Sequence, residues 1–196
     1  MSSRDQILST LKKNQPPRFE LPDVATTVTP VVYPDPKDKF TTILQSIGAT
    51  VINASNVNEI AQYILSTFPA PARVISVVPE LAVSTSPSDF TQKPHGMENV
   101  ELAVLRGQFG VAENGAVWIT DSAMGDRALP FIAAHLALII PKSEIVNTMQ
   151  EAYQRIGDSS HPFGTFIAGP SKTADIEQSL VLGAHGPKSL AVFLID

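Results

Sequence analysis

The sequence predicts a single α/β domain with a mixed, mostly parallel sheet flanked by helices, and with an N-terminal helix on a proline-rich arm. Three observations support this class. From residue 37 onward, segments with helical spacing alternate with apolar runs rich in β-branched residues, which is typical of a largely parallel sheet. The dipeptide Asn114-Gly115 between two apolar segments is a strong hairpin signal, so part of the sheet is antiparallel. The 196 residues, 43% of them apolar, suffice for one core and are few for two domains.

Residues 1–36 are expected to form the helix and the arm, and residues 37–196 the α/β domain. Ser3 and Gln6 have the spacing of a capping box. One apolar stripe follows, at Ile7, Leu8 and Leu11. Residues 15–36 contain six prolines and little periodicity, which indicates an extended connector. We expect the helix to pack on a neighbouring copy of the chain, which would make the protein a homo-oligomer.

Two helix–strand units open the domain. Gly48 suits the left-handed position after the first helix, and Asn56 with Glu59 forms a capping box at the start of the second. Each strand is a run rich in β-branched residues. The first unit is a predicted helix over 37–47 and a strand over 50–53. The second unit is a helix whose apolar stripe covers 60–68 and a strand over 74–78. A loop at 79–98 follows, and loops of this length inside a compact domain are often functional.

The centre of the chain combines a hairpin with a further buried strand. Strands over 100–105 and 115–120 lie on either side of the Asn114-Gly115 turn. A short helical piece around Pro130 follows, and the apolar run 136–140 predicts a strand that is buried on both faces.

The last part of the chain predicts two helices and two strands. A helix from Ser143 to about Ile156 has one apolar face, and Gly157 ends it. Strands over 164–169 and 191–195 enclose a helix over about 173–182, which makes a terminal βαβ unit.

Composition excludes several classes of function. The formal net charge is −5, and Lys12-Lys13 is an isolated basic pair, so nucleic acid is not an expected partner. No apolar run reaches the roughly 20 residues needed to cross a bilayer, so we expect no membrane insertion and a cytoplasmic location. The chain has no cysteine, so any iron–sulfur cluster is expected on a partner subunit and no cofactor on this chain. The histidines are too widely spaced for a recognisable metal site, so no metal is expected.

The most informative segment runs from Gly169 to Pro187. Ser171, Lys172 and Thr173 follow a predicted strand and open a predicted helix, where backbone N–H groups, two hydroxyls and an ammonium group can bind a phosphate or carboxylate. The alternative is that Ser171 or Thr173 only caps the helix.

The later residues of this segment modify that hypothesis. Asp175 and Glu177 count among the candidate ligand-binding residues, but their charges argue against simple phosphate binding. A ten-residue helix is about 15 Å long, so His185 and Gly186 are expected at the opposite edge of the sheet, in a turn or a subunit contact.

Two sequence motifs resemble a known family. They are Gly-Pro-Ser-Lys-Thr-Ala-Asp-Ile-Glu-Gln-Ser-Leu-Val-Leu-Gly-Ala-His-Gly-Pro-Lys at 169–188 and Ala-Glu-Asn-Gly-Ala at 112–116. Both resemble motifs of the lactate-utilisation protein C family, whose shared unit is the LUD domain. The resemblance covers residues 100–196 well and the first half only in layout. It implies a fold of the NagB/RpiA/CoA-transferase-like group of sugar isomerases and CoA transferases. It further implies a role in oxidising L-lactate to pyruvate beside iron–sulfur partner subunits, with a small organic acid as ligand.

The sequence departs from the family pattern at two positions. Ala116 replaces a threonine, and Gln108 stands where the family has an aspartate, so ligand contacts by these positions are not expected. The changes are compatible with a different substrate.

The motif Glu113-Asn114-Gly115 also resembles the Glu-Asn-Gly motif of CoA transferases, in which the glutamate attacks an acyl-CoA thioester. Glu113 is therefore the candidate catalytic residue of an alternative, free-standing enzyme, with Asn114 and Gly115 beside the ligand. The competing interpretation is a surface turn with a solvated Glu113. A third possibility is a non-catalytic subunit that only binds its partners.

Arg127 completes the set of candidate residues. Its guanidinium group can bind the carboxylate of a 2-hydroxy acid with two hydrogen bonds, or it can form an ordinary surface ion pair.

Overall fold

The computed structural model describes residues 2–20, 31–81, 94–158, 161–174 and 180–196. The chain divides into two compact units, Met1–Pro30 and Val31–Asp196. The assignment of residues 37–196 as the α/β domain stays a prediction. Five α-helices are described: α1 (Ser3–Lys13), α3 (Pro36–Ser46), α4 (Val57–Thr67), α5 (Leu129–Ile132) and α6 (Met149–Ile156). Among the described residues, no helix is both long and apolar enough to cross a membrane.

Helix α1 begins one residue earlier than the sequence predicts. Ser2, not Ser3, is the N-cap, and its hydroxyl accepts a hydrogen bond from the Asp5 N–H at 3.3 Å. The Asp5 carboxylate in turn accepts one from the Ser2 N–H at 3.0 Å. The shorter aspartate therefore completes the capping box that was expected from Gln6. Asn14 ends the helix as predicted.

A five-stranded parallel sheet forms the centre of the larger unit, with the strand order β1-β11-β6-β3-β2. Its strands are β1 (Thr50–Ala54), β2 (Val74–Ser76), β3 (Leu102–Arg106), β6 (His135–Pro141) and β11 (Ser189–Ile195). The inner strands are continuous apolar runs because both faces of the sheet are covered. The predicted α/β class is confirmed.

A second, four-stranded sheet has the order β7-β4-β5-β8, in which β4–β5 and β5–β8 are antiparallel and β4–β7 is parallel. Its strands are β4 (Phe109–Val111), β5 (Ala116–Thr120), β7 (Ile145–Val146) and β8 (Gly164–Ile167). The turn between β4 and β5 is the predicted Asn114-Gly115 hairpin, in which Gly115 has φ +71°.

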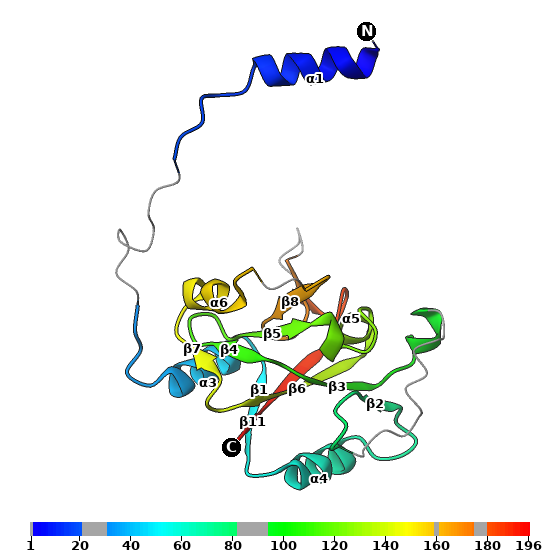
Figure 1. Cartoon of the computed structure of the whole chain (residues 1–196). Helices are drawn as coiled ribbons and strands as arrows, with labels where there is room; N and C mark the ends of the chain where they lie inside the picture. Colours follow the sequence, from blue (N-terminus) through cyan, green and yellow to red (C-terminus); the bar gives the residue numbers. More distant parts are fainter. Residues whose placement is uncertain (1, 21–30, 82–93, 159–160, 175–179) are drawn as a thin grey trace. The chain divides into compact units, whose positions relative to one another are not determined.

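Within the unit Val31–Asp196, the two sheets and the helices are stacked in layers (Figure 1). Helix α4 covers one face of the parallel sheet through Ile60 and Ile64. The second sheet, α3 and α5 pack on the other face and form the largest apolar cluster, which includes Phe40, Leu44 and Ile119. Helix α6 covers the outer face of the second sheet.

The helix predicted from Ser143 begins only at Met149, and β7 occupies part of the predicted range. Thr148 is the N-cap, and its hydroxyl accepts a hydrogen bond from the Glu151 N–H at 3.2 Å. The Thr-x-x-Glu spacing of a capping box was present in the sequence and marks this start.

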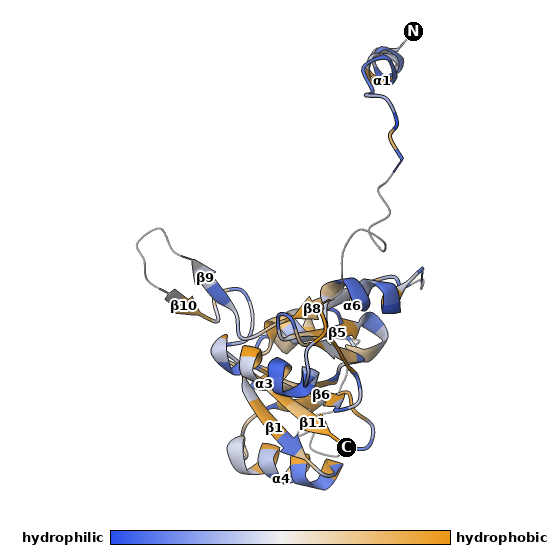
Figure 2. Cartoon of the chain, turned by 90° about the vertical axis from the view of Figure 1, so that its left-hand side faces the viewer, coloured by the Kyte–Doolittle hydropathy of each residue, from blue (hydrophilic) through white to orange (hydrophobic). Residues whose placement is uncertain are grey.

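In the segment predicted as a helix over 173–182, the described residues at both ends are strands. Strands β9 (Lys172–Ala174) and β10 (Leu180–Leu182) form an antiparallel pair instead, and the predicted terminal βαβ unit is wrong. Figure 2 shows this β9–β10 pair projecting from the rest of the unit.

Candidate functional site

The motif at 169–187 folds back on itself so that its two ends meet. The Gly183 N–H donates a hydrogen bond to the Ser171 carbonyl oxygen at 3.0 Å, which extends the β9–β10 pairing by one step. The Ser171 N–H donates to the Pro187 carbonyl oxygen at 2.9 Å. Ser171 and His185 were expected about 15 Å apart along a helix, and that expectation is wrong because a hairpin returns the chain to its starting point.

A cavity of about 270 Å³ lies where the two ends of the motif meet, and we call it the motif cavity. The end of β8, the loop before β9, the turn before β11 and part of α5 surround it. Its lining residues are Pro130, Phe131, Phe166, Ile167, Ala168, Gly169, Pro170, Ser171, Lys172, His185, Gly186 and Pro187.

Three lining side chains carry hydrogen-bonding or charged groups: Ser171, Lys172 and His185. None of the described lining residues is an aspartate or a glutamate, so Lys172 gives the cavity wall a positive formal charge. Gly186 keeps the site open, because a Cβ atom at this position would lie 3.2 Å from Ser171 Cβ. An ammonium group, a hydroxyl and an imidazole together suit an anionic ligand such as a carboxylate.

Lys172 has a second neighbour at the C-terminal end of α3. A Cβ atom built at Gly48 would lie 3.6 Å from the Lys172 Nζ atom. A cation beside the last turn of a helix interacts favourably with the helix dipole. The ammonium group of this cavity-lining residue therefore lies close to the end of α3.

The other candidates of this motif differ in their placement. The Thr173 hydroxyl donates to the Val181 carbonyl oxygen at 3.4 Å, across the β9–β10 pair. Asp175 and Glu177 lie outside the described residues. The assignment of all three as ligand-binding residues stays a prediction.

The Glu113-Asn114-Gly115 motif does not line the motif cavity in the described part of the chain. The Glu113 carboxylate accepts a hydrogen bond from the Met149 N–H at 2.8 Å, at the first turn of α6. Asn114 Oδ1 accepts one from the Ala116 N–H at 3.0 Å, which closes the β4–β5 turn. These contacts give both side chains a structural role.

Arg127 forms the surface ion pair that was one of its two expected roles. Its guanidinium group lies 3.1 Å from an Asp121 carboxylate oxygen and 5.4 Å from the centre of the Phe163 ring. Arg127 is not among the residues that line the motif cavity.

A second polar cavity, of about 630 Å³, lies at the carboxyl end of β3 and was not predicted. Gln108 lines it and donates a hydrogen bond to the buried Thr120 hydroxyl at 3.2 Å. Arg106 and Arg155 line it as well, each paired with a glutamate. The position of Arg106 and Gln108 just after the strand predicted at 100–105 was the signal for this cavity, because open α/β sheets bind ligands at that edge.

The described residues contain no group of three or more His, Asp or Glu side chains that could hold a metal ion.

Comparisons with known proteins show the family of the chain. The family model of the LUD domain matches residues 95–195. The "Lactate utilization protein C" of Shouchella clausii is 34% identical over 121 residues, which are 58% of this chain and 53% of that protein. The protein of the same name from Anoxybacillus flavithermus is 35% identical over 108 residues, which are 51% and 49% of the two chains. The chain thus spans about half the length of the curated relatives it matches.

A solved structure has the same fold. It is the crystal structure of a DUF162 family protein from Deinococcus radiodurans, with a TM-score of 0.65 and 19% sequence identity. The match covers 85% of this chain and 100% of that one.

Proposed function

The chain belongs to the LUD domain family, and on that premise we propose that it is a component of L-lactate utilisation that binds a small organic acid in the motif cavity. The relatives named "Lactate utilization protein C" support the pathway. Those relatives are about twice as long as the region that they share with this chain. That this chain takes part in the same pathway as the complete relatives is therefore part of the proposal.

The observation that carries the proposal is the meeting of Ser171, Lys172 and His185 around one small cavity. L-Lactate offers a carboxylate and a neighbouring hydroxyl group. The Lys172 ammonium group pairs with the carboxylate, while Ser171 and His185 supply hydrogen bonds to the remaining oxygens. The volume of about 270 Å³ is just below the range of cavities that hold drug-sized ligands, which suits a three-carbon acid.

The oxidation step needs an electron acceptor. Two electrons and two protons leave L-lactate when pyruvate forms, and side chains such as Ser171, Lys172 and His185 exchange protons but not electrons. We place the electron acceptors on partner subunits that hold iron–sulfur clusters, in accordance with the absence of cysteine from this chain.

Growth on L-lactate tests the pathway. A strain that lacks the gene is complemented with the wild-type gene, with Lys172→Met, or with Lys13→Met as the matched control. Growth returns with the wild type and with Lys13→Met, whereas Lys172→Met restores it poorly. Unimpaired growth of the deletion strain on L-lactate contradicts the proposed pathway.

Co-purification tests the proposed partners. The chain carries an affinity tag at its natural expression level, and the native complex is analysed for iron and acid-labile sulfide. Iron-bearing subunits are expected to co-purify. A chain that elutes without iron under anaerobic conditions contradicts the assignment as a subunit of an iron–sulfur complex.

A further inference from the structure

Three polar side chains meet at the amino edge of the parallel sheet, outside the motif cavity. His135 begins β6 and Ser189 begins β11, and the two residues are opposite one another in the parallel register. β3 is the neighbour of β6 on the side away from β11, and its first residue, Leu102, is opposite His135. Glu101 directly precedes Leu102. The His135 N–H donates to the Glu101 carbonyl oxygen at 2.8 Å, so the backbone fixes this neighbourhood.

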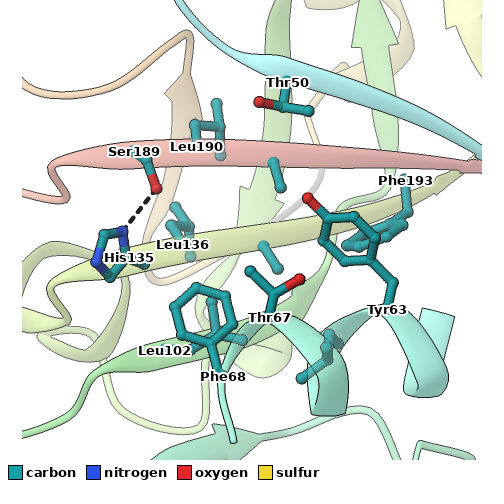
Figure 3. Close-up of a pocket in the computed structure, with 13 residues that line it drawn as sticks. Thr50, Tyr63, Thr67, Phe68, Leu102, His135, Leu136, Ser189, Leu190 and Phe193 are labelled. Atoms are coloured by element: carbon teal, nitrogen blue, oxygen red, sulfur yellow. Dashed lines mark hydrogen bonds between the residues drawn. The ribbon is translucent and has the colours of Figure 1, made fainter. Parts of the chain in front are cut away.

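The side chains form a chain of contacts through the imidazole ring. The Ser189 Oγ atom lies 2.7 Å from His135 Nδ1 (Figure 3). His135 Nε2 lies 3.5 Å from a Glu101 carboxylate oxygen. Ser189 is exposed, and 26% of the His135 side chain is exposed, so the serine hydroxyl is accessible from solvent.

An apolar cavity of about 90 Å³ adjoins these residues. The Phe68 ring packs against the imidazole, with ring centres 5.3 Å apart, and Leu102 and Phe193 complete the apolar wall. Thr50, Tyr63 and Thr67 add hydroxyl groups to the lining. Figure 3 shows that the cavity extends from the His135–Ser189 pair toward Tyr63 and Phe193.

The arrangement has the parts of an acyl-transfer site. A serine next to a histidine base, with the base oriented by a carboxylate on its other nitrogen, is the pattern of an activated nucleophile. When the ring proton is on Nε2, facing the Glu101 carboxylate, the lone pair of Nδ1 points at the Ser189 hydroxyl. The small apolar cavity next to the nucleophile suits an acyl chain of a few carbons.

We propose that Ser189, His135 and Glu101 form a hydrolytic site for esters with short acyl chains. Ser189 Oγ bonds to the carbonyl carbon while its proton passes to His135 Nδ1. The bond to the leaving alcohol breaks, and the alkoxide takes the proton from His135. Water, deprotonated by the same nitrogen, then cleaves the acyl-serine ester, which releases the carboxylic acid and restores the Ser189 hydroxyl. Ser189 and His135 are the catalytic residues, and Glu101 is a positioning residue.

This site is independent of the motif cavity, because the two cavities have no lining residue in common. The site can therefore be tested on the full chain without reference to lactate.

A fluorophosphonate probe and p-nitrophenyl esters test the proposal directly. The probe is expected to label wild-type protein once, and peptide mass spectrometry is expected to place the label on Ser189. The protein-dependent hydrolysis of p-nitrophenyl butyrate is expected to fall at least about 100-fold in kcat/KM for Ser189→Ala and His135→Gln. Ser66→Ala, an exposed serine on the neighbouring helix α4, is the matched control and keeps the wild-type rate.

Glu101→Gln tests the positioning role. We expect a fall of about tenfold in kcat with KM unchanged, because the substrate does not contact Glu101. Circular dichroism and thermal melting verify that each variant is folded. A wild-type protein that the probe does not label at Ser189, or a Ser189→Ala variant that hydrolyses the ester at the wild-type rate, overturns the proposal.

Discussion

The Ser171 N–H donates a 2.9 Å hydrogen bond to the Pro187 carbonyl oxygen, and this bond joins the two ends of the motif that identifies the family. It explains why Lys172 and His185 line one cavity although a β-hairpin separates them in sequence. The motif is therefore one site, and residues on both sides of the hairpin control its shape.

Gly183→Ala is expected to lower the free energy of unfolding by about 1–2 kcal/mol and to weaken ligand binding in the motif cavity. Gly183 has φ +80°, and the added Cβ atom would lie 2.4 Å from Lys188 Cγ. Gly157→Ala is the control, because Gly157 also has a positive φ but ends α6 and lies outside the motif at 169–187. Urea unfolding and calorimetric titration measure the two effects. If Gly183→Ala destabilises the protein while affinity stays unchanged, the turn does not shape the site.

Glu113→Ala is expected to lower the free energy of unfolding by about 1 kcal/mol, because it removes the acceptor of the Met149 N–H at the start of α6. Urea unfolding followed by tryptophan fluorescence measures the change. The control, Glu98→Ala, removes an exposed glutamate and should change stability by less than about 0.5 kcal/mol. Equal free energies of unfolding of Glu113→Ala and Glu98→Ala would contradict the capping role of Glu113.

The CoA-transferase alternative predicts a different property of Glu113. The protein is incubated with an acyl-CoA, trapped with borohydride and mapped by mass spectrometry. We expect Glu113 to stay unmodified, since its carboxylate is exposed and bonded to α6. A modified Glu113 would favour the transferase over the capping role.

Gly164→Ala is expected to destabilise the protein by about 1–3 kcal/mol, because its Cβ atom would lie 2.4 Å from the Trp118 ring. Trp118 is the single tryptophan of the chain, so its fluorescence emission reports the repacking directly. An unchanged emission maximum and an unchanged melting temperature would show that the ring has room to move.

The hydrogen bonds of Asp5 predict a pH dependence of α1. The Ser2 N–H, and then the Ser2 hydroxyl, lower the pKa of the Asp5 carboxyl below its ordinary value of 3.8. Because the folded helix has the lower pKa, the capping contribution is present above pH 3.8 and is lost as the pH falls through the lowered pKa. NMR titration of the Asp5 carboxyl in the full chain is expected to give a midpoint below 3.8, which Ser2→Ala raises. A wild-type midpoint at or above that value contradicts the capping box.

The sequence predicts most of the central fold because its signals are local and agree with one another. The apolar run in β6 has no polar face, and Asn114-Gly115 permits few turns other than a hairpin. The pairing of β9 with β10 decides the structure of the described ends of the segment at 173–182. Its Ala, Glu and Gln residues favour a helix, whereas Leu180–Leu182 also suits a strand, so the local pattern fits both structures.

In both proposed sites, the sequence likewise predicts local positions but not which residues meet. The positions of Ser171 and Lys172 after a strand were evident from the sequence, but their proximity to His185 depends on the return of the chain through the hairpin. The meeting of His135 with Ser189 likewise depends on strand order, since β6 and β11 are neighbours in the sheet but distant in sequence.

Calorimetric titration of the purified full chain with L-lactate tests the central claim most directly, namely that the motif cavity binds a small carboxylate. We predict saturable binding to the wild type and to Lys13→Met, and an affinity at least about tenfold lower for Lys172→Met, because a charge-assisted hydrogen bond contributes about 1.5–3 kcal/mol. Heats at the level of dilution for the wild type, or equal affinities of the wild type and Lys172→Met, would contradict the account.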